Sequence, residues 1–165
     1  MSEAALFKLF VSVAGVNAGN RKYPQHTWLV FLEDHTGRIV WTNMDTKPEG
    51  VDGSQSRVLH LAIRVAVDHI PDNSEVLLFA PQEEVWHIYR VSREQRRQED
   101  YRGSDKKRRK QADIIRDTDD ETERRGITLA ARAVELHDEA FRLKEVRQGA
   151  QDRWEALRDT YNTDF

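Results

Sequence analysis

The chain has 165 residues, of which 38% are apolar and 33% are charged, so it can bury the core of one domain while some elements stay charged over most of their surface. It contains no cysteine, which excludes disulfides, a thiolate nucleophile and cysteine-bound metal. The net charge of −3 favours nucleic-acid binding only through a local patch. The N-terminal apolar run of about ten residues is too short for a signal peptide or a membrane span, so a cytoplasmic protein without membrane association is expected.

Strand signals open the chain. Runs rich in β-branched and aromatic residues predict a first strand over residues 6–13 and a second, doubly covered strand over 27–32. Asp34 and Gly37 favour a turn that leads into a third strand over 38–43, because aspartate begins turns and glycine adopts positive φ. The second and third strands are therefore expected to form a hairpin.

A helix, a strand and a second helix follow. From Ser56 the apolar residues recur at helical spacing as far as Ile70 and form one stripe. Residues 75–80 are a further apolar run of strand length, and Glu83 and Glu84 mark the first turn of the next helix. This alternation of strands and helices predicts an α/β fold.

Residues 93–110 form a basic segment. It has nine lysines and arginines against four acidic residues, a local excess of five positive charges. The run that follows it, ADIIRD (112–117), is a candidate short strand. The chain thus divides into a core over residues 1–118, which includes the basic segment, and a C-terminal part over residues 119–165.

One long helix is expected over residues 119–158. Its acidic start favours a helix N-terminus, and its apolar residues recur at alternating steps of four and three, which is a heptad seam that Arg147 interrupts. A helix of about 40 residues spans ~60 Å, so we expect the last helix of the fold to continue into an extension that pairs with a second copy or another protein. The alternative is that the first half of the helix packs on the sheet and the rest frays. The expected oligomerisation residues are Leu129, Leu136, Leu143, Trp154 and Leu157.

The order of these elements resembles the ribonuclease H-like fold, a mixed sheet of five strands in the order 3-2-1-4-5 flanked by helices. Three stretches carry the resemblance: WLVFLEDHTGRIVWTN, SQSRVLHLAIRVAVDHI and EVLLFAPQEEVWHIY. They are similar, in turn, to the second and third strands, the first helix, and the fourth strand with its helix. The resemblance covers the chain from roughly residue 6 to residue 135 and leaves the rest of the C-terminal helix outside it.

This resemblance implies a site made of carboxylates. The family cleaves the RNA strand of a hybrid with two Mg²⁺ ions, which need anionic oxygen ligands. The first acid belongs at the end of strand one, where this chain has Ser12, and the second on the first helix, where it has His60. The third belongs at the end of strand four, where the chain has Pro81, and the fourth falls loosely near residues 123–127. We therefore expect no metal, no cofactor and no catalysis.

Two groups of cations are candidates for contacts to phosphate. Arg57, His60 and Arg64 share one helix face, which the resemblance turns toward the site; the alternative is a solvated face with Arg64 paired to Asp68. The basic segment lies where some ribonucleases H carry a basic protrusion, and Tyr89 before it and Tyr101 within it are candidates for stacking on bases. The alternatives there are a solvated loop, or neutralisation by the acidic stretch DTDDETE that follows. The phosphate contacts expected from the segment are Arg93, Arg96, Arg97, Arg102, Lys106, Lys107, Arg108, Arg109 and Lys110.

The sequence thus predicts a catalytically inactive ribonuclease H-like protein that binds RNA, DNA or a hybrid and oligomerises through its C-terminal helix. Two other functions stay open. One is an assembly adaptor with no role in nucleic-acid binding. The other is a metal-dependent nuclease with displaced acidic ligands, for which the candidates are Asp34, Asp45, Glu83 and Glu84.

Overall fold

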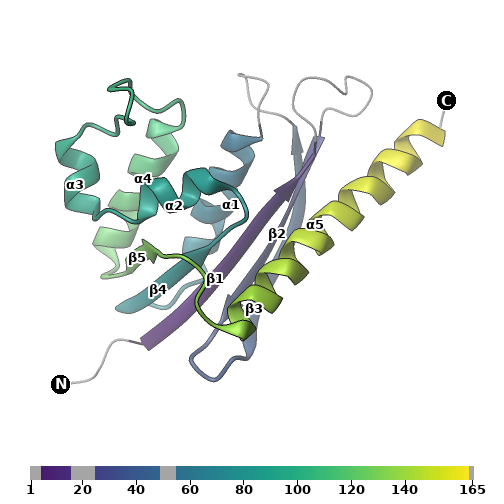
Figure 1. Cartoon of the computed structure of the whole chain (residues 1–165), viewed down its shortest axis with the longest axis horizontal. Helices are drawn as coiled ribbons and strands as arrows, with labels where there is room; N and C mark the ends of the chain where they lie inside the picture. The colour runs from purple at the N-terminus through teal and green to yellow at the C-terminus, as the bar shows by residue number, and fades with distance from the viewer. Residues whose placement is uncertain (1–4, 16–24, 49–54, 164–165) are drawn as a thin grey trace.

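The computed structural model describes residues 5–15, 25–48 and 55–163 (Figure 1). Within these ranges the chain forms five strands and five helices. In chain order they are β1 (Ala5–Ala14), β2 (Gln25–Glu33), β3 (Ile39–Pro48), α1 (Ser56–Val67), β4 (Ser74–Phe79), α2 (Glu83–Tyr89), α3 (Arg93–Gln98), α4 (Ala112–Arg124), β5 (Thr128–Ala131) and α5 (His137–Thr163).

The five strands form one mixed sheet in the order β3-β2-β1-β4-β5, which confirms the predicted order. β1 pairs antiparallel with β2, and β2 with β3, so the expected hairpin is present. β4 and β5 then add in parallel on the other side of β1. β1 is the central strand, and its residue Phe10 lies opposite Phe31 on one side and Phe79 on the other.

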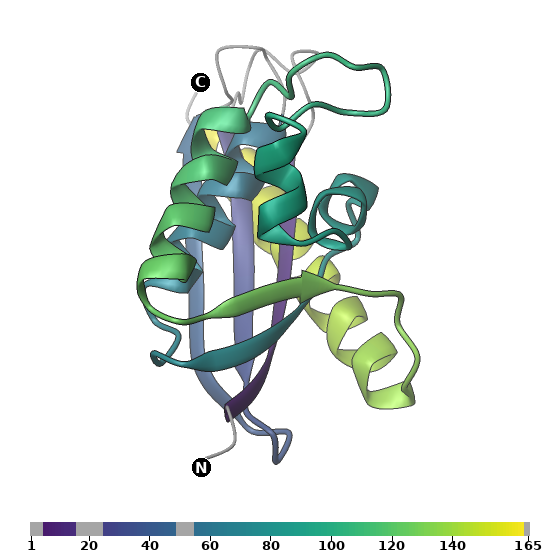
Figure 2. The same ribbon diagram turned by 90° about the vertical axis from the view of Figure 1, so that its left-hand side faces the viewer.

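Helices cover both faces of the sheet (Figures 1 and 2). Side chains of β1 alternate between the faces. Leu9 and Val11 belong to the larger core under α1, whereas Phe10 and Ala14 belong to a smaller core under α5. α4 packs beside α1, and α2 contributes Val85 to the same larger core. This layering leaves α5 alone on its face of the sheet, where it runs obliquely across β1 and β2.

The predicted strand over residues 112–117 is wrong, because these residues begin α4. Ile115, Thr118 and Thr122 are buried at helical spacing, so the pair of isoleucines belongs to an amphipathic helix. The fifth strand is residues 128–131 instead. Gly126 separates the two elements with a φ of 68°, a backbone conformation that favours glycine at a helix C-terminus.

The prediction of one helix over residues 119–158 is also wrong, since β5 and a connection lie between α4 and α5. Leu129 lies in β5 and is buried there. In α5, Trp154 is buried, and Leu143 and Leu157 pack around the same core against the sheet. The apolar stripe of α5 from Leu143 to Leu157 therefore faces this chain's own sheet. The alternative was wrong about which part packs there, because these residues belong to the second half of the predicted helix and not to the first. The apolar stripe of a strict heptad repeat and that of an ideal straight helix drift apart by only about 20° per seven residues. The two patterns therefore cannot be told apart in the sequence over so short a stretch.

Two contacts fix α5 to the sheet. Trp154 Nε1 donates a hydrogen bond to the carbonyl oxygen of Gln25 at 2.8 Å. At Gly149 the helix approaches β2 so closely that an added Cβ would lie 2.5 Å from Cδ2 of Leu29. None of the helices in the described ranges has a stretch that is both long and apolar enough to cross a bilayer.

Candidate functional site

A cleft of about 580 Å³ lies where β1 and β4 end, between the sheet and α5. Ser12 lines it from the end of β1, and Pro81 lines it from the chain just after β4. The parallel pairing of the two strands brings these ends together. Two of the four positions at which the resemblance places an acid, Ser12 and Pro81, therefore meet in one cleft.

The cleft is lined by amides and has no carboxylate among its described residues. Gln82 Nε2 donates to the carbonyl oxygen of Val13 at 3.0 Å, which fixes this side chain across the ends of the two strands. Gln148 and Gln151 come from α5, and Gln55 from the residue before α1. Neutral polar groups thus occupy the position where the resemblance predicts negative charge.

Among the described residues of the cleft, the charged groups are cations from α5. Lys144 and Arg147 both line it and are exposed. Within the part of the chain that the structure describes, neither has a carboxylate oxygen within 4 Å. From the sequence alone, Arg147 is interpreted as a polar interruption of a heptad seam. In the structure Arg147 lies beside the apolar stripe of α5 and lines the cleft.

This donor set does not fit Mg²⁺. A hard cation prefers anionic oxygen ligands, and the described residues of the cleft present a hydroxyl, amides and two cationic groups. Across the described residues, no three His, Asp or Glu side chains come close enough together to hold a metal ion. The acids proposed for a displaced site are separated: Asp34 lies in the β2–β3 turn, Asp45 on β3, and Glu83 and Glu84 at the start of α2.

His60 lies on the other face of the sheet, away from the cleft. Its side chain is buried, and its Nε2 lies 3.2 Å from Oε2 of Glu84, which also accepts a hydrogen bond from Ser56 at 2.8 Å. Burial alone would raise the pKa of Glu84, but the hydrogen bonds from His60 and Ser56 outweigh it and hold the pKa below its ordinary value. The helix position that the resemblance assigns to an acid is therefore an internal link between α1 and α2.

The cationic face of α1 is covered by α4. Arg64 donates to Asp117 and to Asp68, each at 2.7 Å, so the alternative pairing with Asp68 is confirmed. Arg57 lies 3.4 Å from the carboxylate of Asp113. The expectation that this face opens onto the site is wrong, because the acidic face of α4 packs against it.

The first half of the basic segment forms α3 and is neutralised by α4. Arg96 is 5% exposed and forms a bidentate ion pair with Asp119, with N···O distances of 3.0 and 2.6 Å. Arg97 pairs with Asp120 and Glu123, and Arg93 approaches Glu123 at 3.6 Å. Arg96 therefore cannot contact a phosphate, and the predicted folding-back of the acidic stretch is confirmed for this half.

The second half of the segment is a projecting loop, residues 99–111 (Figure 2). Backbone hydrogen bonds join its two arms, from Gly103 N to Lys107 O and from Arg109 N to Tyr101 O, each at 2.9 Å. Tyr89 and Tyr101 are 1% and 5% exposed, so their expected stacking role is wrong. Arg102 and Arg108 lie 3.7 and 3.6 Å from the carboxylate of Asp100. In the described chain, four cations of this loop have no ion pair: Lys106, Lys107, Arg109 and Lys110.

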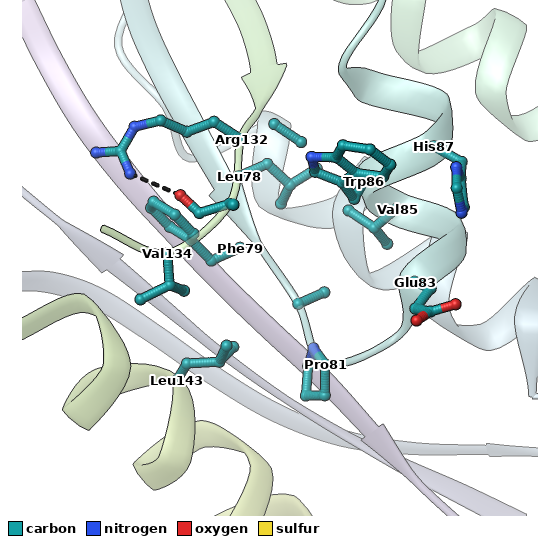
Figure 3. A pocket seen from close by; sticks show the side chains of 13 residues that line it. Leu78, Phe79, Pro81, Glu83, Val85, Trp86, His87, Arg132, Val134 and Leu143 are labelled. Carbon is teal, nitrogen blue, oxygen red and sulfur yellow. Dashed lines mark hydrogen bonds between the residues drawn. The ribbon is translucent and has the colours of Figure 1, made fainter. Parts of the chain in front are cut away.

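An apolar pocket of about 350 Å³ lies on the edge of the sheet near β5 (Figure 3). Trp86 and Val85 of α2 form one side, and Val134 and Leu143 form the other. Trp86 is 39% exposed, and beyond the pocket Leu136 and Phe141 are 53% and 65% exposed. Leu136 is thus the one seam residue that the structure leaves largely open to solvent among the described residues.

The sequence matches no protein-family model and no curated protein. The fold does match solved structures. The foamy viral protease-reverse transcriptase in complex with an RNA/DNA hybrid has 13% identity and a TM-score of 0.63 over 92% of this chain, which spans 20% of that protein's length. The PFV RNase H domain has 11% identity and a TM-score of 0.59, with 90% of this chain and 96% of that one covered. LC11-RNase H1 in complex with an RNA/DNA hybrid has 12% identity and a TM-score of 0.56, with coverages of 89% and 97%. At these identities the likeness establishes the ribonuclease H-like fold alone.

Sequence reasoning missed Lys144 and Gln82 and misjudged Arg147. A signal was present for two of them, because Lys144, Arg147, Gln148 and Gln151 recur at spacings of three and four and form a polar stripe next to the apolar one. Gln82 has no such pattern, since its position depends on how β4 ends beside β1.

Proposed function

We propose that this chain is a ribonuclease H-like protein that binds nucleic acid without cleaving it. The observation that supports the loss of cleavage is the cleft, in which Ser12 and Pro81 meet with amides and cations and without a carboxylate among the described residues. Two-metal cleavage depends on anionic ligands, so a cleft of this composition lacks the groups that would hold the ions.

The projecting loop supports the binding half of the proposal. Its unpaired lysines are free to contact phosphates, and such contacts supply most of the sequence-independent affinity of a nucleic-acid-binding protein. Two of the proteins with a similar fold were solved with an RNA/DNA hybrid, which makes a hybrid a natural first ligand to test.

Binding and cleavage are best read from the same samples. The full-length protein would be titrated into labelled RNA–DNA hybrid, duplex DNA and single strands, with Mn²⁺ in one series and EDTA in another. We expect binding that weakens steeply with salt and strands that stay intact in both series. Cleavage that requires Mn²⁺ and stops in EDTA would contradict the proposal and favour a nuclease with displaced ligands.

Replacing Lys106, Lys107 and Lys110 with serine is expected to weaken nucleic-acid binding. Log affinity falls linearly with log salt concentration, and each lost phosphate contact makes this slope shallower by about 0.7 to 0.9. The three substitutions should therefore make it shallower by about 2 to 3 in total. Fluorescence anisotropy over a range of salt concentrations measures this directly.

A matched control carries serine at Arg38, Arg124 and Arg153, which are exposed and lie outside both the loop and the cleft. It removes the same charge and should keep most of the salt slope. Equal loss in the two variants would show that only net charge matters and that the loop has no special role.

A second candidate function is self-association, as in an assembly adaptor. The observation that favours it is the pair of large apolar side chains near the start of α5, where Leu136 is 53% and Phe141 is 65% exposed. Leu143, Trp154 and Leu157 of the expected seam pack against the sheet, and Leu129 lies in β5. A dimer would therefore use this end of the helix and not the full heptad pattern.

The double substitution Leu136→Asp and Phe141→Asp is expected to halve the mass of such a dimer in light scattering, because it places charges in an apolar contact. Tyr161→Asp, at the far end of α5, is the control and should leave the mass unchanged. A wild-type protein that is already monomeric at high concentration would rule out this candidate.

A further inference from the structure

We propose that the cleft at the ends of β1 and β4 binds a phosphate group directly, with Lys144 and Arg147 supplying the positive charge that bound metal ions would otherwise supply. This inference deepens the proposed function and rests on it where the phosphate belongs to a nucleic acid. It assigns the cleft a role that is separate from that of the projecting loop.

The spacing of the two cations is suited to one anion. Residues three apart on a helix lie on the same face, with their Cβ atoms about 5–6 Å apart, so the two side chains can converge on a single group. Both line the cleft, and Trp154 and Gly149 hold the helix that carries them against the sheet. An arginine also has a planar fork that matches two oxygens of a phosphate.

The charges near the cleft favour an anion. None of the described residues that line it is acidic. The acids that follow the two cations along α5 are Asp152 and Glu155, which accept hydrogen bonds from Gln148 at 2.8 Å and from Gln151 at 2.9 Å. Those amides lie between the acids and the two cations along the helix. Glu145, next to Lys144 in the sequence, is paired with Arg142 at 3.0 Å.

The remaining lining is compatible with a phosphate. Ser12 brings a hydroxyl, and amides such as Gln55 can donate hydrogen bonds to phosphate oxygens. The same groups would be poor ligands for Mg²⁺. Binding in the cleft should therefore be as strong in EDTA as in Mg²⁺, which separates this site from any metal-mediated one.

The test compares two double variants of the full-length chain. Lys144→Gln with Arg147→Gln removes both cations from the cleft, and Arg38→Gln with Arg153→Gln removes the same charge from exposed positions outside it. Binding of a labelled single-stranded oligonucleotide is measured in EDTA over a range of salt. Relative to the control, we expect the cleft variant to bind about tenfold or more weakly. Its slope of log affinity against log salt concentration should be shallower by about 1.4. Equal behaviour of the two variants would overturn the proposal.

A second measurement separates failure of the cleft from failure of nucleic-acid binding. Inorganic phosphate is titrated into wild-type protein in EDTA and followed by amide NMR at Ser12, Ala14 and the side-chain amide of Gln82. Saturable shifts that are absent in the cleft variant would support the phosphate site even if the protein bound no oligonucleotide. No shifts, together with no difference between the variants, would overturn it while the loop remained able to bind.

Discussion

Glu139→Gln is expected to lower the free energy of unfolding by about 3 kcal/mol, because it removes the charge from a fully buried carboxylate that holds two cations. Glu139 accepts two hydrogen bonds from Arg132, at 2.9 and 2.7 Å, and a third contact from Lys8 at 2.7 Å. The backbone N–H groups of Glu135 and Leu136 donate to the same carboxylate. One side chain thus ties β1, the β5–α5 connection and the first turn of α5 together. Urea denaturation at pH 7 measures the loss.

The effect should depend on pH. The hydrogen bonds from Arg132 outweigh the opposing effect of burial and, with Lys8, hold the pKa of Glu139 far below its usual value of 4.5. A carboxyl whose pKa is lowered by folding stabilises the protein fully above its unfolded pKa and loses that contribution as the pH falls below it. The gap between wild type and Glu139→Gln should therefore narrow by about 1.4 kcal/mol for each pH unit below roughly 4.5.

Glu135→Gln is the control for this variant. Its carboxylate is 3.8 Å from the same arginine but is 66% exposed, so its replacement should cost less than about 1 kcal/mol. If the two substitutions had equal effects, the buried carboxylate would not be the element that holds the start of α5.

Asp119→Ala is expected to destabilise the protein by about 3–5 kcal/mol, because it leaves the buried guanidinium of Arg96 without its partner. Adding Arg96→Met should recover a large part of that loss, since a buried ion pair replaced by apolar groups is often close to neutral. The recovery should be incomplete, because Arg96 also donates to the carbonyl oxygen of Val91 at 2.6 Å. Thermal or urea unfolding of the wild type, Asp119→Ala, Arg96→Met and the double variant measures both the loss and the recovery.

The neighbouring residue provides the control. Asp120 pairs with Arg97 on the surface at 2.9 Å and is 61% exposed, so Asp120→Ala should cost less than about 1 kcal/mol. A loss of that small size for Asp119→Ala as well would contradict the idea that this pair locks α3 onto α4.

The sequence predicted the fold well where a pattern was local. β1, β2 and β4 are apolar runs of strand length, and Asp34 and Gly37 are residue types that favour a turn. The order and pairing of these strands could therefore be anticipated. Residues 112–131 could not be divided correctly, because two isoleucines look the same in a short strand and in a helix. The signal within this range was Gly126, which ends α4. Earlier in the chain, Ser92 marks the start of α3, where its hydroxyl accepts a hydrogen bond from the N–H of Gln95.

The candidate site was less predictable because it depends on long-range packing. Ser12 and Pro81 could be placed together through the resemblance, and the structure does bring both to one cleft. His60 could not be placed, since only the packing of α2 decides that it faces Glu84. The charge of the basic segment was also misleading, because the sequence does not show which arginines the following helix will neutralise.

The close contact at Gly149 has a consequence for how this surface tolerates change. A methyl group there would displace either the buried end of Leu29 or the helix axis itself. Lys144, Arg147 and Gln151 lie within about one turn of that point, so tilting the helix would carry them away from the strand ends. Gly149 does not line the cleft, yet a substitution there would shift the helix residues that do line it and so change the shape of the cleft.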